Sequence, residues 1–373
     1  MSLKVLITNV FMDGLSGTVL YVRDLALELQ RRGHRPAVYT WKIGKACAEL
    51  EAAGIPVVTD PRRIGFSPDV VHGHHRLLAL GALRHYPGVP ILSFCHDHRS
   101  PLDRALLEPQ VLRHLGVSRL CVNRLIKEGA PVQRTSLLPN FVDLRRFRER
   151  PPLPDKPKRA LVFSNYACAG THLPAVAEAC RRMGLELDVV GSGVGRESQR
   201  PEELLGEYDL VFAKAKAAME AMAVGTAVVL CDFGGLGPMV TAADFDRLRP
   251  LNFGFQALTE PLTPAAVEEQ ILRYDPDDAL RVRDRIRSCA GLEETVGQLV
   301  TLYEQVIHEA KTSLFPLSGT DTTRSFQAWR HRRLCFVLSR YHVWRSRISA
   351  KQSWLVKRLR KIRYTLMDRG FIG

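Results

Sequence analysis

One short segment of the chain combines an ammonium group, a carboxylate and a pair of glycines. Lys214 precedes a run of helical composition, and Glu220 stands within that run between apolar neighbours (AAMEAMAV). The apolar residues Ala227–Leu230 come next, and Gly234–Gly235 follow them closely. A carboxylate among apolar side chains costs free energy unless polar groups satisfy it, and glycine lets backbone N–H groups approach a phosphate or a sugar. These residues therefore predict a site for a phosphorylated, hydroxyl-rich ligand.

Histidines follow two apolar runs in the first half of the chain. They are His72, His74, His75, His96 and His98, with Asp97 between the last two. So many imidazoles suggest a metal site. However, we expect the rings of His72 and His74, which one glycine separates, to point in different directions unless the chain turns. We therefore predict polar packing at the strand ends and no metal.

A glycine turn follows the first apolar run. Gly14, Gly17 and Thr18 lie between the strand-like residues Lys4–Thr8 and a helical pattern over residues 19–29. Exposed backbone N–H groups and the helix dipole attract anions at such a position. The spacing is not that of a GxGxxG fingerprint, so a purely structural turn is the alternative to a phosphate-binding loop.

The elements that must position these residues alternate between apolar runs and helical patterns, which is typical of a parallel, doubly wound α/β sheet. The expected strands of the first half are Lys4–Thr8, Pro36–Tyr39, Pro56–Thr59, Asp69–His72, Pro90–Phe94, Ser118–Val122 and Ser136–Leu138. Those of the second half are Ala160–Phe163, Glu186–Val190, Asp209–Ala213 and Ala227–Leu230.

Two such α/β segments predict two Rossmann-like domains that face each other across a cleft. We expect a first domain over 1–147, a proline-rich linker over 148–158 (RERPPLPDKPK), a second domain over 159–310 and a basic tail over 311–373. Helical patterns near Pro264–Leu272 and Leu292–Ala310 are expected to close the second domain.

The order of EAMA, a small-residue turn, a VV strand and a GG loop resembles the donor site of the retaining GT-B glycosyltransferases of family 4. The resemblance covers about residues 3–310. It implies a nucleotide-diphosphate sugar as the donor, an acceptor bound by the N-terminal domain, retention of the anomeric configuration, and neither a metal nor another cofactor. It also implies that Glu220 binds two ribose hydroxyls. The other substrate-binding residues that it implies are Gly14, Gly17, Thr18, Asp97, Gly234, Gly235 and Leu236.

The resemblance gives His96 a catalytic role. Its imidazole would hydrogen-bond a sugar hydroxyl and stabilise charge as the glycosidic bond opens, with Asp97 as a weaker companion. We expect Lys214 to be the second catalytic residue, because an ammonium beside a helix N-terminus can stabilise a departing diphosphate. Lys216 fits this role and that of an exposed surface lysine equally well.

The chain departs from the family pattern at three places. Position 212 is Phe where the family usually has a second Glu, and the stretch VFSNYACAG lacks the usual Arg/Lys pair. Gly237–Pro238 replaces the acidic residue that usually follows the GG loop. A non-catalytic nucleotide-sugar-binding or scaffold protein is therefore the alternative to a transferase, and a sugar-nucleotide epimerase is a second one.

The net charge of +14 is concentrated in the tail. Residues 311–373 contain four Lys and eleven Arg but two Asp, so they carry almost all of the excess. Leucines, isoleucines and three of the four tryptophans recur there at helical spacing, which predicts basic amphipathic helices on an anionic membrane surface. Docking on another protein is the alternative. No nucleic-acid reader motif accompanies the tail, so we expect no nucleic acid as a partner.

The remaining composition predicts a cytoplasmic protein, peripheral at the inner face of the membrane. No apolar run is long enough to span a bilayer, and the first residues resemble no signal peptide. The eight cysteines form no CxxC pair, so we expect reduced, mostly buried thiols. A glycan precursor linked to lipid or to the cell envelope is then the expected acceptor.

Overall fold

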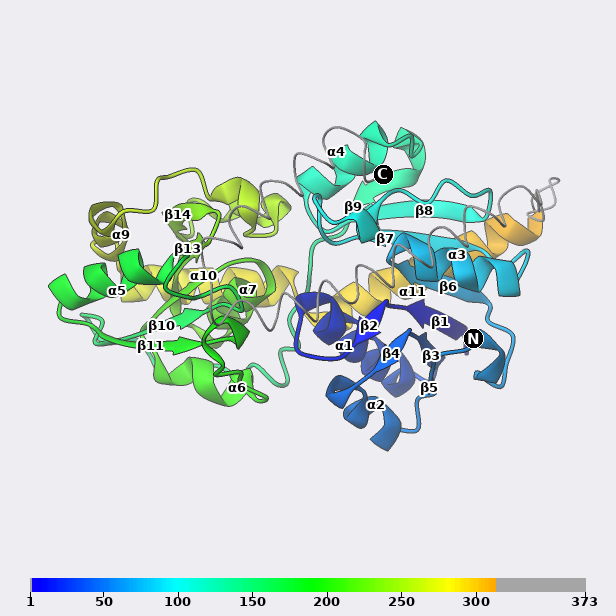
Figure 1. Cartoon of the computed structure of the whole chain (residues 1–373), viewed down its shortest axis with the longest axis horizontal. Helices are drawn as coiled ribbons and strands as arrows, with labels where there is room; N and C mark the ends of the chain where they lie inside the picture. The colour runs from blue at the N-terminus through cyan, green and yellow to red at the C-terminus, as the bar shows by residue number, and fades with distance from the viewer. Residues whose placement is uncertain (1, 313–373) are drawn as a thin grey trace. The chain divides into compact units, whose positions relative to one another are not determined.

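The computed structural model describes residues 2–312, and these divide into two compact units (Figure 1). The first unit contains residues 2–148, 246–252 and 284–312, and the second contains residues 149–245 and 253–283. Each unit has its own sheet of parallel strands, with one antiparallel edge strand in the second, which confirms the prediction of a doubly wound α/β fold with two Rossmann-like units. The predicted helices of the basic tail lie outside the described residues.

The sheet of the first unit has seven strands in the order β5-β3-β1-β6-β7-β8-β9, all parallel. The order reverses at β1, because β3 pairs with one edge of β1 and β6 with the other. Apolar residues on both faces of the central strands are buried, as in other parallel sheets. The strands are β1 (Lys4–Thr8), β3 (Arg35–Tyr39), β5 (Val57–Val58), β6 (Val70–His74), β7 (Ile91–Cys95), β8 (Val111–Gly116) and β9 (Thr135–Leu137); β2 (Phe11–Met12) and β4 (Lys42–Ile43) form a separate pair.

One strand prediction in this unit is wrong. Residues 118–122, expected to be a strand, begin the helix α4 (Arg119–Lys127), and the strand is the preceding β8. Ser118 is the N-cap of α4, and its Oγ accepts a hydrogen bond from the Cys121 N–H (3.3 Å). Serine satisfies a helix N-terminus in this way, whereas the short apolar run by itself favours neither structure. The other helices are α1 (Gly17–Arg31), α2 (Ala48–Ala52) and α3 (Arg76–His85).

The last described helix, α11 (Leu292–Thr312), belongs to the first unit, so the prediction that it closes the second domain is wrong. Its apolar face, which includes Leu299 and Val306, packs into the same core as Leu25 and Leu29 of α1. The periodicity of the helix identifies a buried face, but it does not reveal which sheet covers that face.

The sheet of the second unit has five strands in the order β11-β10-β12-β13-β14. Four strands are parallel, and β14 pairs antiparallel with β13 at the edge. The order reverses at β10, whose neighbours are β11 and β12. The strands are β10 (Arg159–Phe163), β11 (Glu186–Val190), β12 (Leu210–Ala213), β13 (Ala227–Asp232) and β14 (Gly235–Met239).

Helices flank this second sheet, as Figure 1 shows in green. The helix α7 (Ala215–Val224) is buried along most of its length and ends at Gly225, whose φ of 101° is accessible to glycine but strained for other residues. The others are α5 (Leu173–Arg182), α6 (Pro201–Leu204), α8 (Phe245–Leu248), α9 (Pro264–Ile271) and α10 (Pro276–Cys289), of which α8 and α10 cross from one unit to the other along the chain.

Seven of the cysteines lie within the described residues, and all seven are free. Five are buried, in keeping with the prediction of mostly buried thiols; they are Cys47, Cys95, Cys121, Cys180 and Cys231.

Candidate functional site

Lys214 lies at the topological switch point of the second unit. Ligands of open α/β sheets bind beyond the carboxyl ends of the strands where the strand order reverses, here between β10 and β12. Lys214 follows β12 directly and is the N-cap residue of α7. Its neighbour Ala215 has a φ of 52°, a strained value for a residue other than glycine, and its N–H donates to the carbonyl of Phe253 (2.8 Å). The hydrogen bond to Phe253 stabilises this turn, and the turn fixes the direction in which the Lys214 side chain leaves the backbone.

The ammonium group of Lys214 is enclosed by a carboxylate and two aromatic rings. Nζ lies 2.9 Å from Asp232 Oδ2, and it lies 4.5 Å and 5.3 Å from the ring centroids of Phe255 and Tyr166. The side chain of Lys214 is 18% exposed, whereas that of Asp232 is 1% exposed. The ion pair and the cation–π contacts therefore fix the ammonium of a side chain that stays partly exposed.

Asp232, the last residue of β13, organises this end of the sheet. Its Oδ1 accepts hydrogen bonds from Ser164 Oγ (3.2 Å) and from the Phe233 N–H (2.7 Å), and His172 Nδ1 lies 3.8 Å from it. His172 is fully buried, and neither of its ring nitrogens has a hydrogen-bond partner among residues 2–312. Burial lowers the pKa of His172 more than the Asp232 carboxylate raises it, and the charge of Lys214 lowers it further. The imidazole is therefore neutral near pH 7.

Glu220 has a partner that the sequence prediction did not assign to it. Lys216 Nζ lies 3.2 Å from Glu220 Oε1, and the two side chains are 7% and 4% exposed. The alternative of an exposed Lys216 is therefore wrong. The buried carboxylate is satisfied at least in part by an i,i+4 ion pair, while its binding of ribose hydroxyls stays a prediction.

Of the paired glycines, Gly234 lies in the turn between β13 and β14, and Gly235 is the first residue of β14. Asp232 pairs with Gly235 across this hairpin, and Gly235 has a φ of 143°. A Cβ on Gly234 would lie 2.7 Å from the ring of Phe255, so glycine is required for the aromatic ring to pack here. The backbone N–H of Leu236 donates to the Glu260 carbonyl (3.1 Å), which leaves this amide, expected to meet the donor, engaged within the protein. The loop is therefore more closely packed than predicted, because we expected its backbone N–H groups to be open to a ligand.

The switch point of the first unit lies between β1 and β6, where the predicted glycine turn and several histidines occur. Gly14 is exposed and has a φ of 79°, which favours glycine at this position. Gly17 and Thr18 open α1, and a Cβ on Gly17 would meet no atom within 4 Å. The first turn of α1 carries no acidic residue, so nothing in it repels an anion. Phosphate binding by this turn stays a prediction.

His72 and His74 point their rings to the same side of β6, which corrects the expectation that they diverge. Their ring centroids are 4.7 Å apart. Residues i and i+2 of a strand share a face, so the intervening Gly73 imposes no divergence. His72 Nδ1 lies 2.5 Å from the hydroxyl of Tyr303 of α11, and His74 Nδ1 lies 2.6 Å from His96 Nε2.

His96 follows β7 and is held from two sides. Its backbone N–H donates to Asp103 Oδ1 (2.7 Å), and its ring meets that of His74 as described. Burial, and then the neighbouring His75, lower the pKa of His96 to about 3. Burial also lowers the pKa of His75 to about 4 and holds that of His74 well below its usual value. The cluster is therefore neutral near pH 7 and suited to hydrogen bonding with uncharged hydroxyls.

Asp97, the predicted companion of His96, is exposed and belongs to a fixed loop. Its Oδ1 accepts from the Arg99 N–H (2.8 Å), and Arg124 donates to the carbonyls of Asp97 (2.8 Å) and Ser100 (2.7 Å). The loop after His96 is therefore attached to α4. Contact between Asp97 and a sugar stays a prediction.

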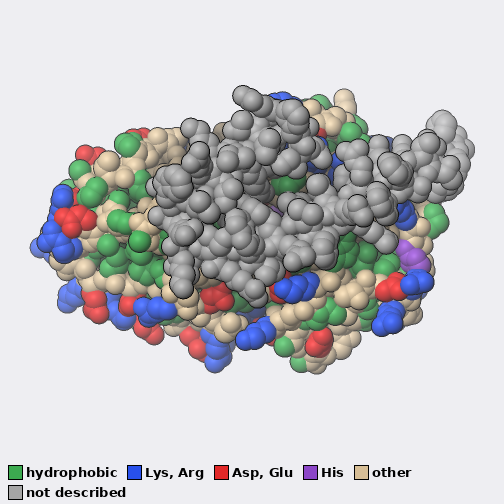
Figure 2. Space-filling view, viewed as in Figure 1, with side chains coloured by type: hydrophobic (Ala, Val, Ile, Leu, Met, Phe, Trp, Pro, Cys, Tyr) green, Lys and Arg blue, Asp and Glu red, His purple; other side chains and the backbone are tan. Residues whose placement is uncertain are grey.

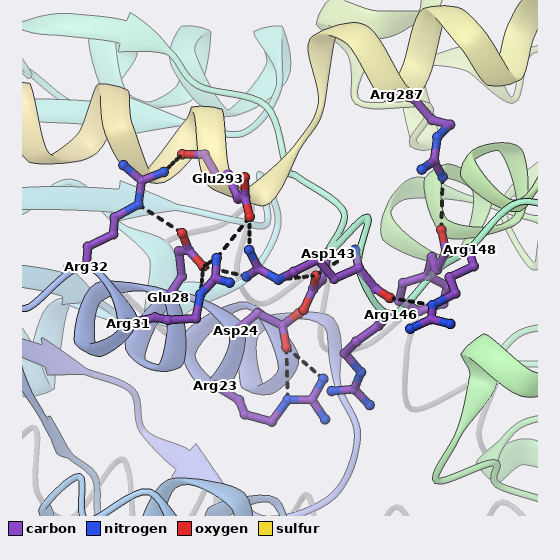
Figure 3. Close-up of polar contacts among 12 residues, drawn as sticks. Arg23, Asp24, Glu28, Arg31, Arg32, Asp143, Arg146, Arg148, Arg287 and Glu293 are labelled. Carbon is purple, nitrogen blue, oxygen red and sulfur yellow. Dashed lines mark hydrogen bonds and ion pairs between the residues drawn. The ribbon is translucent and has the colours of Figure 1, made fainter.

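A charged network fixes α1, the helix that follows the glycine turn (Figure 3). Glu28 is buried, and its carboxylate pairs with Arg31 (2.8 Å), Arg32 (2.9 Å) and Arg145 (2.5 Å). Arg31 and Arg145 also pair with Glu293 at the start of α11. One buried carboxylate thus ties α1 to the chain segment before residue 148 and to α11, all within the first unit.

The structure brings the predicted site residues together in two groups, one in each unit. Lys214 lies near the Gly234–Gly235 turn through Phe255, and His96 lies among the other histidines. Sequence reasoning missed several residues that complete these groups. The i,i+4 spacing would have found the Lys216–Glu220 pair, and position at a strand end would have found Asp232. No pattern pointed to the others, which are Tyr21, Asp103, Tyr166, His172, Phe255 and Tyr303.

Within residues 2–312, no group of three or more His, Cys, Asp and Glu side chains is arranged to hold a metal ion. None of the helices there is long and apolar enough to cross a bilayer. On the described part of the face in Figure 2, basic and acidic side chains are interspersed, in agreement with the small net charge of this part of the sequence.

Two Rossmann-like units, each with polar residues at the switch point of its sheet, define a GT-B chain. Residues 15–146 match the model of Glycosyltransferase Family 4, so the chain resembles the GT-B glycosyltransferases of that family, as the sequence predicts. No curated protein sequence matches the chain significantly.

Solved structures support the fold. Alr3699/HepE from Anabaena, in complex with UDP and glucose, is 15% identical with a TM-score of 0.59, over 81% of this chain and 99% of that one. A glycosyltransferase from Rickettsia africae is 13% identical with a TM-score of 0.60, over 84% and 100%. MnaA from S. aureus, solved with UDP, is 14% identical with a TM-score of 0.51, over 83% and 98%. At such identities the likeness establishes the GT-B fold alone.

Proposed function

We propose that this protein is a glycosyltransferase that moves a sugar from a nucleotide-diphosphate donor to a glycan or lipid-linked acceptor. The anomeric configuration would be retained, and neither a metal nor another cofactor would take part. The observation that carries the proposal is the position of Lys214, whose side chain is partly exposed at the switch point of the second unit. The family match over residues 15–146 and the UDP-bound structures of similar fold support it.

In this proposal, Lys214 neutralises charge on the departing diphosphate. The leaving group gains negative charge as the glycosidic bond opens, and a cation beside it stabilises that charge and lowers the barrier. The adjacent N-terminus of α7 adds its dipole to the charge of Lys214. The chain would thereby replace the missing Arg/Lys pair by one lysine from the neighbouring strand.

His96 would act on the sugar. A neutral imidazole can donate one hydrogen bond to a hydroxyl or accept one from it, without adding a positive charge beside the developing oxocarbenium ion. Burial keeps this ring neutral across the physiological range. Its two anchors, at Asp103 and at His74, limit the entropy lost when a sugar binds.

A donor screen tests the proposal. The full chain is incubated with UDP-, GDP- and ADP-sugars, with and without EDTA, and released nucleoside diphosphate is measured together with the configuration of the product. We expect release from one donor class, undiminished by EDTA. The same screen reveals an epimerised donor, the outcome that the epimerase alternative requires.

A non-catalytic nucleotide-sugar-binding protein is the second candidate. Two observations favour it, since Glu220 is paired with Lys216 and Lys214 is paired with Asp232. Nucleotide binding without turnover of any donor would support this candidate over the transferase.

We also propose that the basic tail, residues 311–373, holds the protein on an anionic membrane at its cytoplasmic face. The proposal depends on the sequence of the tail, with its arginines and tryptophans at helical spacing. Flotation with vesicles of neutral or anionic lipid, using the full chain and a chain ending at residue 312, tests it. Binding that ignores the anionic lipid would contradict it.

A further inference from the structure

Three ionisable groups gather at the carboxyl ends of the strands in the second unit. Lys214 follows β12, Asp232 ends β13, and His172 precedes α5. The carboxylate lies between the other two, 2.9 Å from Lys214 Nζ and 3.8 Å from His172 Nδ1. Asp232 and His172 are at most 1% exposed, so no water replaces a lost partner cheaply.

The charges of this cluster balance as long as Lys214 stays beside Asp232. Lys214 contributes one positive charge, Asp232 one negative charge and neutral His172 none. A diphosphate that takes Lys214 as its cation removes that balance and leaves a buried carboxylate uncompensated. Breaking a buried pair in this way is strongly unfavourable, which opposes binding of the donor.

His172 can restore the balance. It is fully buried, and its two ring nitrogens have no hydrogen-bond partner within residues 2–312. Its Nδ1 lies 3.8 Å from Asp232 Oδ1, so a small shift of the ring would bring the two atoms within hydrogen-bonding distance. Asp232 and Lys214 are the charged groups that act on it, in opposite directions. Departure of Lys214 removes the positive charge that opposes protonation and leaves the negative charge that favours it.

We propose that His172 replaces Lys214 as the cation beside Asp232 when a nucleotide diphosphate draws Lys214 away, by taking up one proton from solvent. This inference rests on the proposed role of Lys214 as the diphosphate cation. Lys214 keeps its own proton throughout, and the proton on His172 comes from water or buffer. Donor binding is then coupled to proton uptake, and affinity for the diphosphate falls as the pH rises above the value at which the bound form loses that proton.

The first test needs no donor. Histidine titration by NMR is compared in the wild type and the Lys214→Met variant, which removes the ammonium but keeps an unbranched side chain. The His172 resonance is assigned by its absence in His172→Asn. The pKa of His172 should rise by about one unit or more in Lys214→Met, because Asp232 then acts on it alone. It should not rise in a Lys214→Met, Asp232→Asn double variant.

The second test measures protons taken up on binding. Calorimetry of UDP-glucose, GDP-mannose and ADP-glucose at pH 7.0 is repeated in buffers of different ionisation enthalpy. Both phosphates of these compounds are esters, so the ligands do not titrate near this pH. The donor that binds should cause a fractional proton uptake in the wild type and none in His172→Asn. His114→Asn, a buried histidine of β8 in the first unit, is the control and should behave as the wild type.

The outcomes separate this inference from the proposed function. An unchanged pKa of His172 in Lys214→Met, or donor binding without proton uptake, would overturn the inference and leave the transferase proposal standing. Absence of binding by all three donors would overturn the proposed function and this inference with it. Circular dichroism of each variant confirms that it is folded, and His172→Gln serves as a second variant should His172→Asn not fold.

Discussion

His74 Nδ1 and His96 Nε2 lie 2.6 Å apart, and the ring of Tyr21 meets both imidazoles edge-on, at centroid distances of 5.2 and 4.9 Å. Both rings are neutral near pH 7, so a single proton lies between these two nitrogens. His74 Nε2 is buried and has no hydrogen-bond partner among the described residues. An orphaned N–H is costlier than an orphaned lone pair, so His74 donates through Nδ1 and leaves its Nε2 unprotonated. His96 then carries its own proton on Nδ1, as a donor for a ligand.

Replacing His74 by Phe should lower turnover without unfolding the protein. Phenylalanine keeps a ring between Tyr21 and Phe94 but removes the hydrogen bond that fixes the tautomer of His96. One such bond contributes about 1 kcal/mol, so kcat should fall about fivefold while the KM for the donor changes little. Steady-state kinetics measure the split, and nitrogen-15 shifts of His96 report its tautomer.

His85→Asn is the control for this variant, because His85 is an exposed residue of α3. It should leave kcat, KM and the His96 spectrum as in the wild type. A His74→Phe enzyme with an unchanged His96 tautomer would show that His74 only packs.

The histidine cluster should make the protein sensitive to mild acid. The pKa values of His72, His74, His75 and His96 are all lowered in the fold, mainly by burial. As the pH falls below about 6.5, the unfolded chain takes up protons that the folded chain refuses, so the stability present above that pH is lost. Urea unfolding from pH 7.5 to 5 measures the loss. His74→Phe should lose less stability over the same interval, and an equal loss would contradict this account.

Lys214 and Lys216 offer a matched pair of substitutions two residues apart. Lys214→Ala should lower turnover by on the order of a hundredfold or more, the usual effect of removing one electrostatic contact to the reacting groups. Lys216→Ala should instead lower the free energy of unfolding by about 3 kcal/mol, because it leaves the buried carboxylate of Glu220 without this cation. Turnover assays and urea unfolding of both variants measure the two effects. Equal effects on turnover, or unchanged turnover in Lys214→Ala, would contradict the assignment.

The sequence predicts the alternation of strands and helices well because buried parallel strands and helix caps are local signals. Most strands of both sheets lie within two residues of their predicted positions, and all strands of the two sheets except β14 pair in parallel as expected. Two predictions are wrong because the local sequence does not contain the information that decides them. Residues 118–122 lack a decisive period, and α11 carries an apolar face that fits either core. Neither ambiguity can be resolved without the tertiary structure.

The residues of the candidate site that directly follow a strand could be predicted from the sequence. Lys214, His96 and the paired glycines each lie at the carboxyl end of a strand, where sequence order alone places them. Their partners come from elsewhere in the chain: Asp232 from the next strand for Lys214, Asp103 from the following loop for His96. The spacing of these pairs has no period, so only the folded chain brings them together.

Asp103 should give the loop after His96 a pH dependence of its own. This carboxyl is 3% exposed, and burial raises its pKa to about 7. A raised carboxyl pKa means that the folded chain holds the proton more tightly than the unfolded chain, so the contribution to stability is full below pH 3.8 and is lost as the pH rises to about 7.

Asp103→Asn keeps an acceptor for the His96 N–H but does not titrate. Relative to this variant, the wild type should therefore lose stability, by a few kcal/mol at most, between pH 4 and pH 8. Urea unfolding of both proteins across that interval measures the difference. A difference between wild type and Asp103→Asn that stays constant with pH would show that Asp103 is charged throughout and that the loop is held by an ordinary carboxylate.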